Sequence, residues 1–130
     1  MREIKFRGKI RNGKWVYGYA AKFAHDSVPV ILEDTEDGIT PRKIIPETIG
    51  QFTGLHDKNG KEIYEGDIIV SEDYSHARHY VRYIDDEAMY VAMIIGSSLM
   101  EYCAIRQSWI DKFSKKIIGN IHDNHELLNK

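Results

Sequence analysis

The sequence predicts a mainly β protein, a β-rich α+β fold whose only expected helix is short and lies near the C-terminus. Residues 3–11 alternate charged and apolar side chains with the period of two that is typical of a half-buried strand. Asn12-Gly13 follows directly and is the pair most typical of a two-residue hairpin loop. Beyond this hairpin, short apolar runs alternate with clusters of acidic residues, glycine and asparagine, which predicts further short strands joined by tight turns.

The first hairpin has a predicted register, because a two-residue loop fixes which residues face each other. Arg11 then faces Lys14 and Lys9 faces Val16, with the second strand running to about Phe23. The bulky apolar side chains are expected on the buried face: Ile4, Phe6, Ile10, Trp15, Tyr17 and Tyr19. The cations are expected on the opposite face: Lys5, Arg7, Lys9, Arg11, Lys14 and Lys22.

This basic face has two interpretations. Rows of charge are commonly solvated and protect an edge from aggregation, which favours a surface role. The alternative is a phosphate-binding ribbon, since Glu3 is the only acidic residue before Asp26. The candidate nucleic-acid-binding residues are then Lys5, Arg7, Lys9, Arg11 and Lys14. The expected register puts the aromatic rings on the other face, which argues against base stacking.

The middle of the chain predicts a second hairpin and a buried strand. Residues 28–32 and 39–45 read as its two strands, with residues 33–37 as an acidic tip and Pro41 on an edge strand. Residues 49–55 are a further predicted strand, and residues 56–61 form a polar turn. That turn places Gly60 wrongly for an EF-hand loop, so it is not expected to bind calcium. Gly66-Asp67 then opens a buried strand.

Four segments together resemble the YopX family of phage and prophage proteins. The central block is residues 45–55 (IPETIGQFTGL) and 57–69 (DKNGKEIYEGDII), and residues 1–7 and 118–128 resemble the family's opening and close. The resemblance implies a phage or prophage origin and a β-rich fold, but it implies no site residues. The strand entry at Gly66-Asp67 also resembles small SH3-like barrels, an analogy of fold alone. We therefore expect a single YopX-like domain, with N-terminal hairpins over about 1–50 and a barrel-like region over about 51–130.

The C-terminal part predicts strands over residues 79–84, 89–95 and 116–121, with an acidic turn at 85–87. Asp123 or Asn124 is expected to cap a short helix through Leu128. Residues 97–115 fit a strand or a helix, and the sequence leaves this choice open.

No recognised catalytic motif is present, and we expect neither an enzyme nor a cofactor. There is no phosphate loop, dinucleotide fingerprint or nucleophile elbow. His122 and His125 are weak candidates for a metal site, because they are three residues apart at the start of the expected helix, where such residues share a face. His76 and His79 have the same spacing, but His79 is expected to begin a strand, on which residues three apart point to opposite faces. Cys103 is better explained as a small packed hydrophobe than as a nucleophile.

Composition narrows the function classes. The 130 residues carry a net charge of -2 with a pI near 6.3, which argues against binding of nucleic acid or membrane by the molecule as a whole. One cysteine and a charged N-terminus favour the cytoplasm of a bacterial host. We expect a phage or prophage accessory protein that acts as a protein-binding or self-associating module, such as a homo-oligomer. A nucleic-acid-binding module is the first alternative, and a small metal-dependent enzyme is the second.

Overall fold

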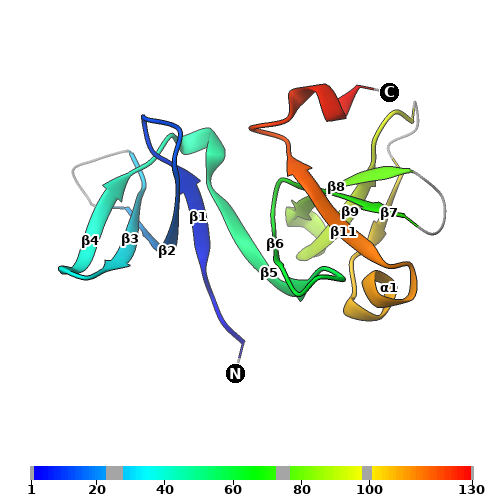
Figure 1. Ribbon diagram of the computed structural model, residues 1–130, viewed down its shortest axis with the longest axis horizontal. Coiled ribbons are helices and arrows are strands. Elements are labelled where there is room, and N and C mark those ends of the chain that lie inside the picture. Colours follow the sequence, from blue (N-terminus) through cyan, green and yellow to red (C-terminus); the bar gives the residue numbers. More distant parts are fainter. Residues whose placement is uncertain (1, 23–27, 73–76, 98–100, 130) are drawn as a thin grey trace. The chain divides into compact units, whose positions relative to one another are not determined.

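The computed structural model describes residues 2–22, 28–72, 77–97 and 101–129, so Phe23 and His76 lie outside the described ranges. Over these ranges the chain is mainly β, which confirms the predicted fold class (Figure 1). The chain divides into two compact units, Met1–Phe52 and Thr53–Lys130. We name them the N-terminal unit and the C-terminal unit and describe each by itself.

The N-terminal unit is an antiparallel sheet built from two hairpins and the start of a fifth strand. Its strands lie in the order β4-β3-β2-β1-β5. Their bounds are β1 Phe6–Lys9, β2 Trp15–Ala21, β3 Val30–Thr35, β4 Gly38–Lys43 and β5 Gly50–His56, with a short 3-10 helix at Pro46–Thr48 before β5. Val16, Ile31 and Ile44 form the buried core, with Phe6 and Ile10 packed against it.

The predicted register of the first hairpin is wrong by one residue. Lys9 pairs with Trp15 and Arg7 with Tyr17. The amide of Ile10 donates to the carbonyl of Lys14 at 3.0 Å, while the carbonyl of Ile10 accepts from the amide of Gly13 at 2.9 Å. The loop therefore has three residues, 11–13, and ends with Gly13 at φ 88°. An Asn-Gly pair suits both loop lengths, because both need a glycine at positive φ.

The shift reverses which side chains of β2 are buried. The inner face holds Val16 and two glycines, and both glycines lie against neighbouring residues. A Cβ added to Gly8 would lie 2.7 Å from Cδ1 of Ile44, and one added to Gly18 would lie 2.0 Å from the carbonyl oxygen of Leu32. At these two positions the inner face therefore has no room for a side chain, and the ring that packs against the core comes from Phe6, the partner of Gly18.

The aromatic side chains that were predicted to be buried consequently lie outside. Tyr17 is 45% exposed, Tyr19 is 65% exposed, and Ile4 is 47% exposed. Trp15 is half-buried. The prediction that these four residues belong to the core is wrong. For the three rings of β2 the reason is the register, because a one-residue slip moves every side chain of a strand to the other face. Ile4 is exposed because it lies before β1, which begins at Phe6.

The second hairpin is confirmed. Thr35 pairs with Gly38, so Glu36 and Asp37 form its two-residue loop. Pro41 lies on β4, the edge strand, where a missing amide donor is tolerated.

The C-terminal unit contains a five-stranded antiparallel sheet in the order β10-β9-β8-β7-β11. The bounds are β6 Glu62–Tyr64, β7 Asp67–Ser71, β8 Arg78–Ile84, β9 Met89–Ile94, β10 Tyr102–Ala104 and β11 Lys115–Asn120. One α-helix, α1 Gln107–Lys112, and 3-10 helices at Asp85–Glu87 and His125–Leu128 complete the described part. The core is Ile63, Ile69, Val81, Ile105 and Ile110.

The SH3-like barrel expected for this half is not formed, because the described strands make open sheets. Closure would require the two edge strands to pair, whereas β10 pairs with β9 and β11 pairs with β7. The ambiguous segment 97–115 includes the short strand β10 followed by helix α1. In the parts of the chain that are described, helices are too short and too polar to cross a membrane.

The short C-terminal helix is present as one 3-10 turn, with Asn124 at the N-cap position. The side chain of Asn124 does not cap it. Its Oδ1 instead accepts a hydrogen bond from the amide of Asn120 at 3.1 Å, which ties the turn back to the end of β11.

Candidate functional site

One surface of the N-terminal unit combines cations with exposed aromatic rings. Side chains of directly paired residues in an antiparallel sheet lie on the same face. The observed pairing therefore puts Lys9 beside Trp15 and Arg7 beside Tyr17, with Tyr19 next along β2. We name this surface the β1–β2 face: Arg7, Lys9, Trp15, Tyr17 and Tyr19.

Trp15 is held by the two cations of β1. The guanidinium carbon of Arg7 lies 4.6 Å from the centroid of the Trp15 ring, and Nζ of Lys9 lies 5.7 Å from it. Arg7 is only 6% exposed. Its guanidinium therefore serves mainly to fix the indole ring through a cation–π contact, whereas the half-buried Lys9 lies closer to solvent.

Tyr17 and Tyr19 are the most accessible rings of this face. They flank Gly18, whose missing side chain lets the backbone of β3 approach closely at Leu32. β2 pairs with β1 over residues 15–18 and with β3 over residues 19–21, so Tyr17 and Tyr19 each lie in a paired segment of backbone. Both phenol rings are therefore presented to solvent by a rigid central strand rather than by a loop.

The other three predicted nucleic-acid-binding residues lie at the margins of this face. Nζ of Lys5 lies 5.6 Å from the centroid of Phe52 and 3.6 Å from a carboxylate oxygen of Glu3. Arg11 and Lys14 are exposed at the hairpin loop. The predicted row of cations is therefore not purely basic, because aromatic rings of β2 lie beside the cations of β1.

Comparison with known proteins settles the family. The YopX protein family model matches residues 5–129, nearly the whole chain. The chain belongs to the YopX family. This confirms the resemblance that the sequence showed.

A solved structure is similar to this chain over nearly its whole length. The crystal structure of protein EF1440 from Enterococcus faecalis is 26% identical in sequence and superimposes with a TM-score of 0.66. The alignment covers 99% of this chain and 100% of that chain. No curated protein matches the chain.

In the central YopX block, Asp57 accepts hydrogen bonds from the backbone amides of a turn and of a neighbouring strand. Asp57 is 5% exposed, and its Oδ1 accepts hydrogen bonds from the amides of Asn59 and Lys61 at 2.8 and 2.9 Å. Its Oδ2 accepts from the amide of Ile117 at 3.0 Å. One carboxylate thus closes the turn at residues 57–61 and fastens it to β11.

A second carboxylate of the YopX block has the same kind of role. Oδ2 of Asp67 accepts from the amide of Tyr64 at 2.7 Å, across a turn in which Gly66 has φ 91°. The amide of Gly66 donates to Val81, and its carbonyl accepts from Ile121. These two YopX residues thus connect β6 and β7 with β8 and with the residue that follows β11.

His122 and His125, the predicted candidates for a metal site, lie in different surroundings. The ring of His122 packs beside Gly66, since a Cβ on Gly66 would lie 3.5 Å from its Nε2, while His125 is exposed. Within the described ranges, no three or more His, Cys, Asp or Glu side chains gather in a way that could hold a metal ion.

Cys103 lies on β10, the edge strand of its sheet, and it is exposed, so the prediction that it is a small packed hydrophobe is wrong. Partial desolvation raises the pKa of its thiol, and nearby Lys115 opposes this increase only partly. The thiol is therefore protonated near neutral pH, the state in which a cysteine is a poor nucleophile.

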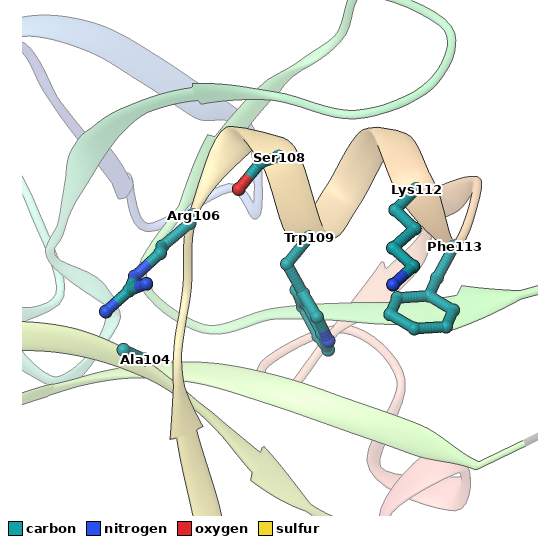
Figure 2. Close-up of a pocket in the computed structure, with 6 residues that line it drawn as sticks. All are labelled: Ala104, Arg106, Ser108, Trp109, Lys112 and Phe113. Atoms are coloured by element: carbon teal, nitrogen blue, oxygen red, sulfur yellow. The ribbon is translucent and has the colours of Figure 1, made fainter.

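A pocket in the C-terminal unit was not predicted from the sequence. Figure 2 shows it beside α1, with Arg106 before the helix, Trp109 in its middle, and Lys112 and Phe113 at its end. Ser108 and Ala104 complete the lining. The sequence signal was weak, because residues 97–115 fitted a strand or a helix and the two choices place these side chains differently.

Proposed function

We propose that this YopX-family chain binds single-stranded nucleic acid on the β1–β2 face. Bases would stack on Tyr17 and Tyr19, and Lys9 with the loop cation Arg11 would contact phosphates, whereas Lys14, which pairs with Ile10, belongs to the opposite face. The observation that carries the proposal is the hairpin register, because it brings exposed rings and cations to one face. Aromatic platforms bordered by cations are the general means of holding single strands.

The spacing of the rings favours a single strand over a duplex. Tyr17 and Tyr19 are two residues apart on β2, which separates them by about 6.6 Å along the strand. Successive nucleotides of one strand of a duplex are only about 3.4 Å apart. Each ring can therefore meet a separate unstacked base, which a base-paired helix does not offer.

The charge of the chain determines how strongly the binding of nucleic acid should depend on salt. With a net charge of -2, attraction is local and comes from few cations. With about two phosphate contacts, the logarithm of the binding constant should fall with the logarithm of salt concentration with a slope of about -1.4. Stacking, which depends little on salt, would supply the remainder.

A protein partner is the second candidate, and the same exposed residues favour it. Tyrosine is enriched in protein interfaces, and Ile39 on β4 is also 61% exposed. Self-association through this face, or a host protein docked on it, would bury these apolar groups.

The test is fluorescence anisotropy of labelled 12-nucleotide single-stranded DNA and RNA and of the matching duplex, at low and then rising salt. The variants are Tyr17→Ala, Tyr19→Ala and Lys9→Gln. Tyr102→Ala and Arg82→Gln are the matched controls, because both residues are exposed but lie in the C-terminal unit. Each tyrosine variant should weaken binding by about 1 kcal/mol or more, roughly five-fold, and the controls should bind like the wild type.

Duplex binding equal to single-strand binding, or equal losses in variants and controls, would contradict the proposal. Absence of binding at low salt would also contradict it. If light scattering then showed an oligomer that Tyr19→Ala dissociates, the protein-interaction candidate would take its place.

A further inference from the structure

The pocket beside α1 has the size of a small-molecule site. Its volume is about 400 Å³, within the ~300–1,000 Å³ common for ligand pockets. It lies wholly in the C-terminal unit and shares no residue with the β1–β2 face. An inference about it is therefore independent of the proposed function.

The wall of the pocket is fixed in place. Ile110 is fully buried in the core, and Ile105 precedes the helix as another core residue. The side chain of Gln107 accepts from the amide of His56 at 3.0 Å and donates to its carbonyl at 2.8 Å. These contacts hold α1 on both sides, so the side chains facing the pocket have a rigid base.

The lining offers aromatic surface and positive charge. Trp109 and Phe113 are half-buried aromatic rings, and Arg106 and Lys112 are exposed cations. The six lining residues include no carboxylate. The nearby acid on the helix, Asp111, accepts a hydrogen bond from Gln107 Nε2 at 3.0 Å.

A third cation, Lys115, packs against the ring of Trp109. Lys115 is 5% exposed, and its Nζ lies 4.6 Å from the centroid of Trp109. Burial lowers the pKa of this amine, which means that its charge is incompletely compensated. An anion bound near Trp109 would relieve that cost, so the site favours negatively charged ligands.

We propose that this pocket binds a mononucleotide, an aromatic base with one phosphate group. The base packs against Trp109, and the phosphate is held by Arg106 with the hydroxyl of Ser108. Arg106 suits this role, because a guanidinium binds phosphate through two parallel hydrogen bonds. Lys112, at the far end of α1, adds positive potential without having to touch the phosphate.

The test uses the two tryptophans of the chain, Trp15 and Trp109, as separate reporters. Indole N–H signals of the full ¹⁵N-labelled chain are followed while adenosine 5′-monophosphate is added, and a Trp109→Phe variant assigns the signals. The Trp109 signal should shift and saturate. Adenosine alone and inorganic phosphate alone should bind at least ten-fold more weakly, because each offers one of the two contacts.

Two variants probe the contacts. Arg106→Gln should weaken binding of the mononucleotide at least five-fold, and Ala104→Leu should weaken it by filling the pocket. Arg82→Gln, an exposed cation on β8, is the matched control and should leave binding unchanged.

The proposal is overturned if the Trp109 signal does not move up to about 5 mM mononucleotide, or if Arg106→Gln binds as tightly as the control. It is also overturned if only the Trp15 signal moves, since the ligand then occupies the β1–β2 face. That last result would leave the proposed single-strand function standing, so the two proposals fail separately.

Discussion

His79, on β8, shows how a single residue links this fold to pH. Its ring meets the edge of Trp109 at right angles, with 5.6 Å between the ring centroids. Burial, and to a lesser extent the charge of Lys115, lowers its pKa to about 4. The ring is therefore neutral in the folded protein at pH values where a histidine in an unfolded chain is already protonated.

The stability of the C-terminal unit should fall as the pH decreases from about 6.5 to about 4. In that window the unfolded chain binds more protons at this position than the folded chain does, so acid favours unfolding. We expect His79 to account for about 1–2 kcal/mol of that loss. Urea unfolding at pH 7.5 and 5.0 measures it, and His79→Phe should lose less stability between the two pH values than the wild type. His125→Gln, at an exposed histidine, should lose as much as the wild type, and an equal loss in His79→Phe would contradict the assignment.

At the scale of elements, the first hairpin decides what the N-terminal unit can do. Both its loop and the close approach of β2 to β3 depend on glycine, but for different reasons. Gly13 has φ 88° and nothing within 4 Å of an added Cβ, whereas a Cβ on Gly18 would meet the Leu32 carbonyl oxygen. The first glycine is needed for backbone conformation, and the second for space between two strands.

Gly18→Ala should therefore destabilise the N-terminal unit by more than ~2 kcal/mol, because backbone atoms of β3 would have to move. Gly13→Ala is the matched control and should cost only about 1–2 kcal/mol, the cost of a left-handed conformation for a residue with a side chain. Denaturant unfolding followed by Trp15 fluorescence in a Trp109→Phe background compares the two. Equal losses would contradict the close approach of β2 and β3.

The three-residue loop makes a direct prediction for NMR. Lys9 and Trp15, and Arg7 and Tyr17, should show strong Hα–Hα contacts, because Ile10 and Lys14 close the loop and these pairs alternate with hydrogen-bonded ones. The two-residue loop would instead bring the Hα atoms of Ile10 and Trp15 together. Observing that contact would restore the face assignment expected from the sequence and remove the basis for the proposed stacking surface.

At the scale of the whole molecule, the described residues form two core clusters. Val16, Ile31 and Ile44 form one, and a separate cluster that includes Ile69 forms the other. The two clusters lie in different compact units. Units with their own cores commonly open separately.

Ile31→Ala and Ile69→Ala should each cost about 2–5 kcal/mol, and each loss should be confined to its own unit. Both residues are fully buried, so the two substitutions are matched. Amide hydrogen exchange resolved by residue is the measurement, and Ile45→Ala, at a residue 38% exposed, is the control. Faster exchange in both units from either substitution would show that the chain unfolds as one cooperative body.

Much of this molecule could be predicted from its sequence. Alternation and turn residues are local signals, and they placed β1, β2, the hairpin of β3 and β4, and the strands β5, β7, β8, β9 and β11 close to their observed bounds. The YopX resemblance was equally accessible, since it depends on the order of residues and not on their arrangement in space. The acidic turn at residues 85–87 was found for the same reason, whereas the acidic tip predicted over residues 33–37 is shorter, because residues 33–35 belong to β3.

Only the tertiary structure decided which side chains share a surface. Asn12-Gly13 permits a two-residue or a three-residue loop, and the choice depends on what packs against the strands: Ile44 over Gly8, and β3 against Gly18. A one-residue difference there turns a purely basic face into one where cations and aromatic rings stand together. Likewise, the pocket beside α1 depends on a helix whose existence the sequence left open, and its Trp109 ring packs against Lys115 from β11. Register and packing arise from contacts between residues distant in the sequence, and local patterns do not encode them.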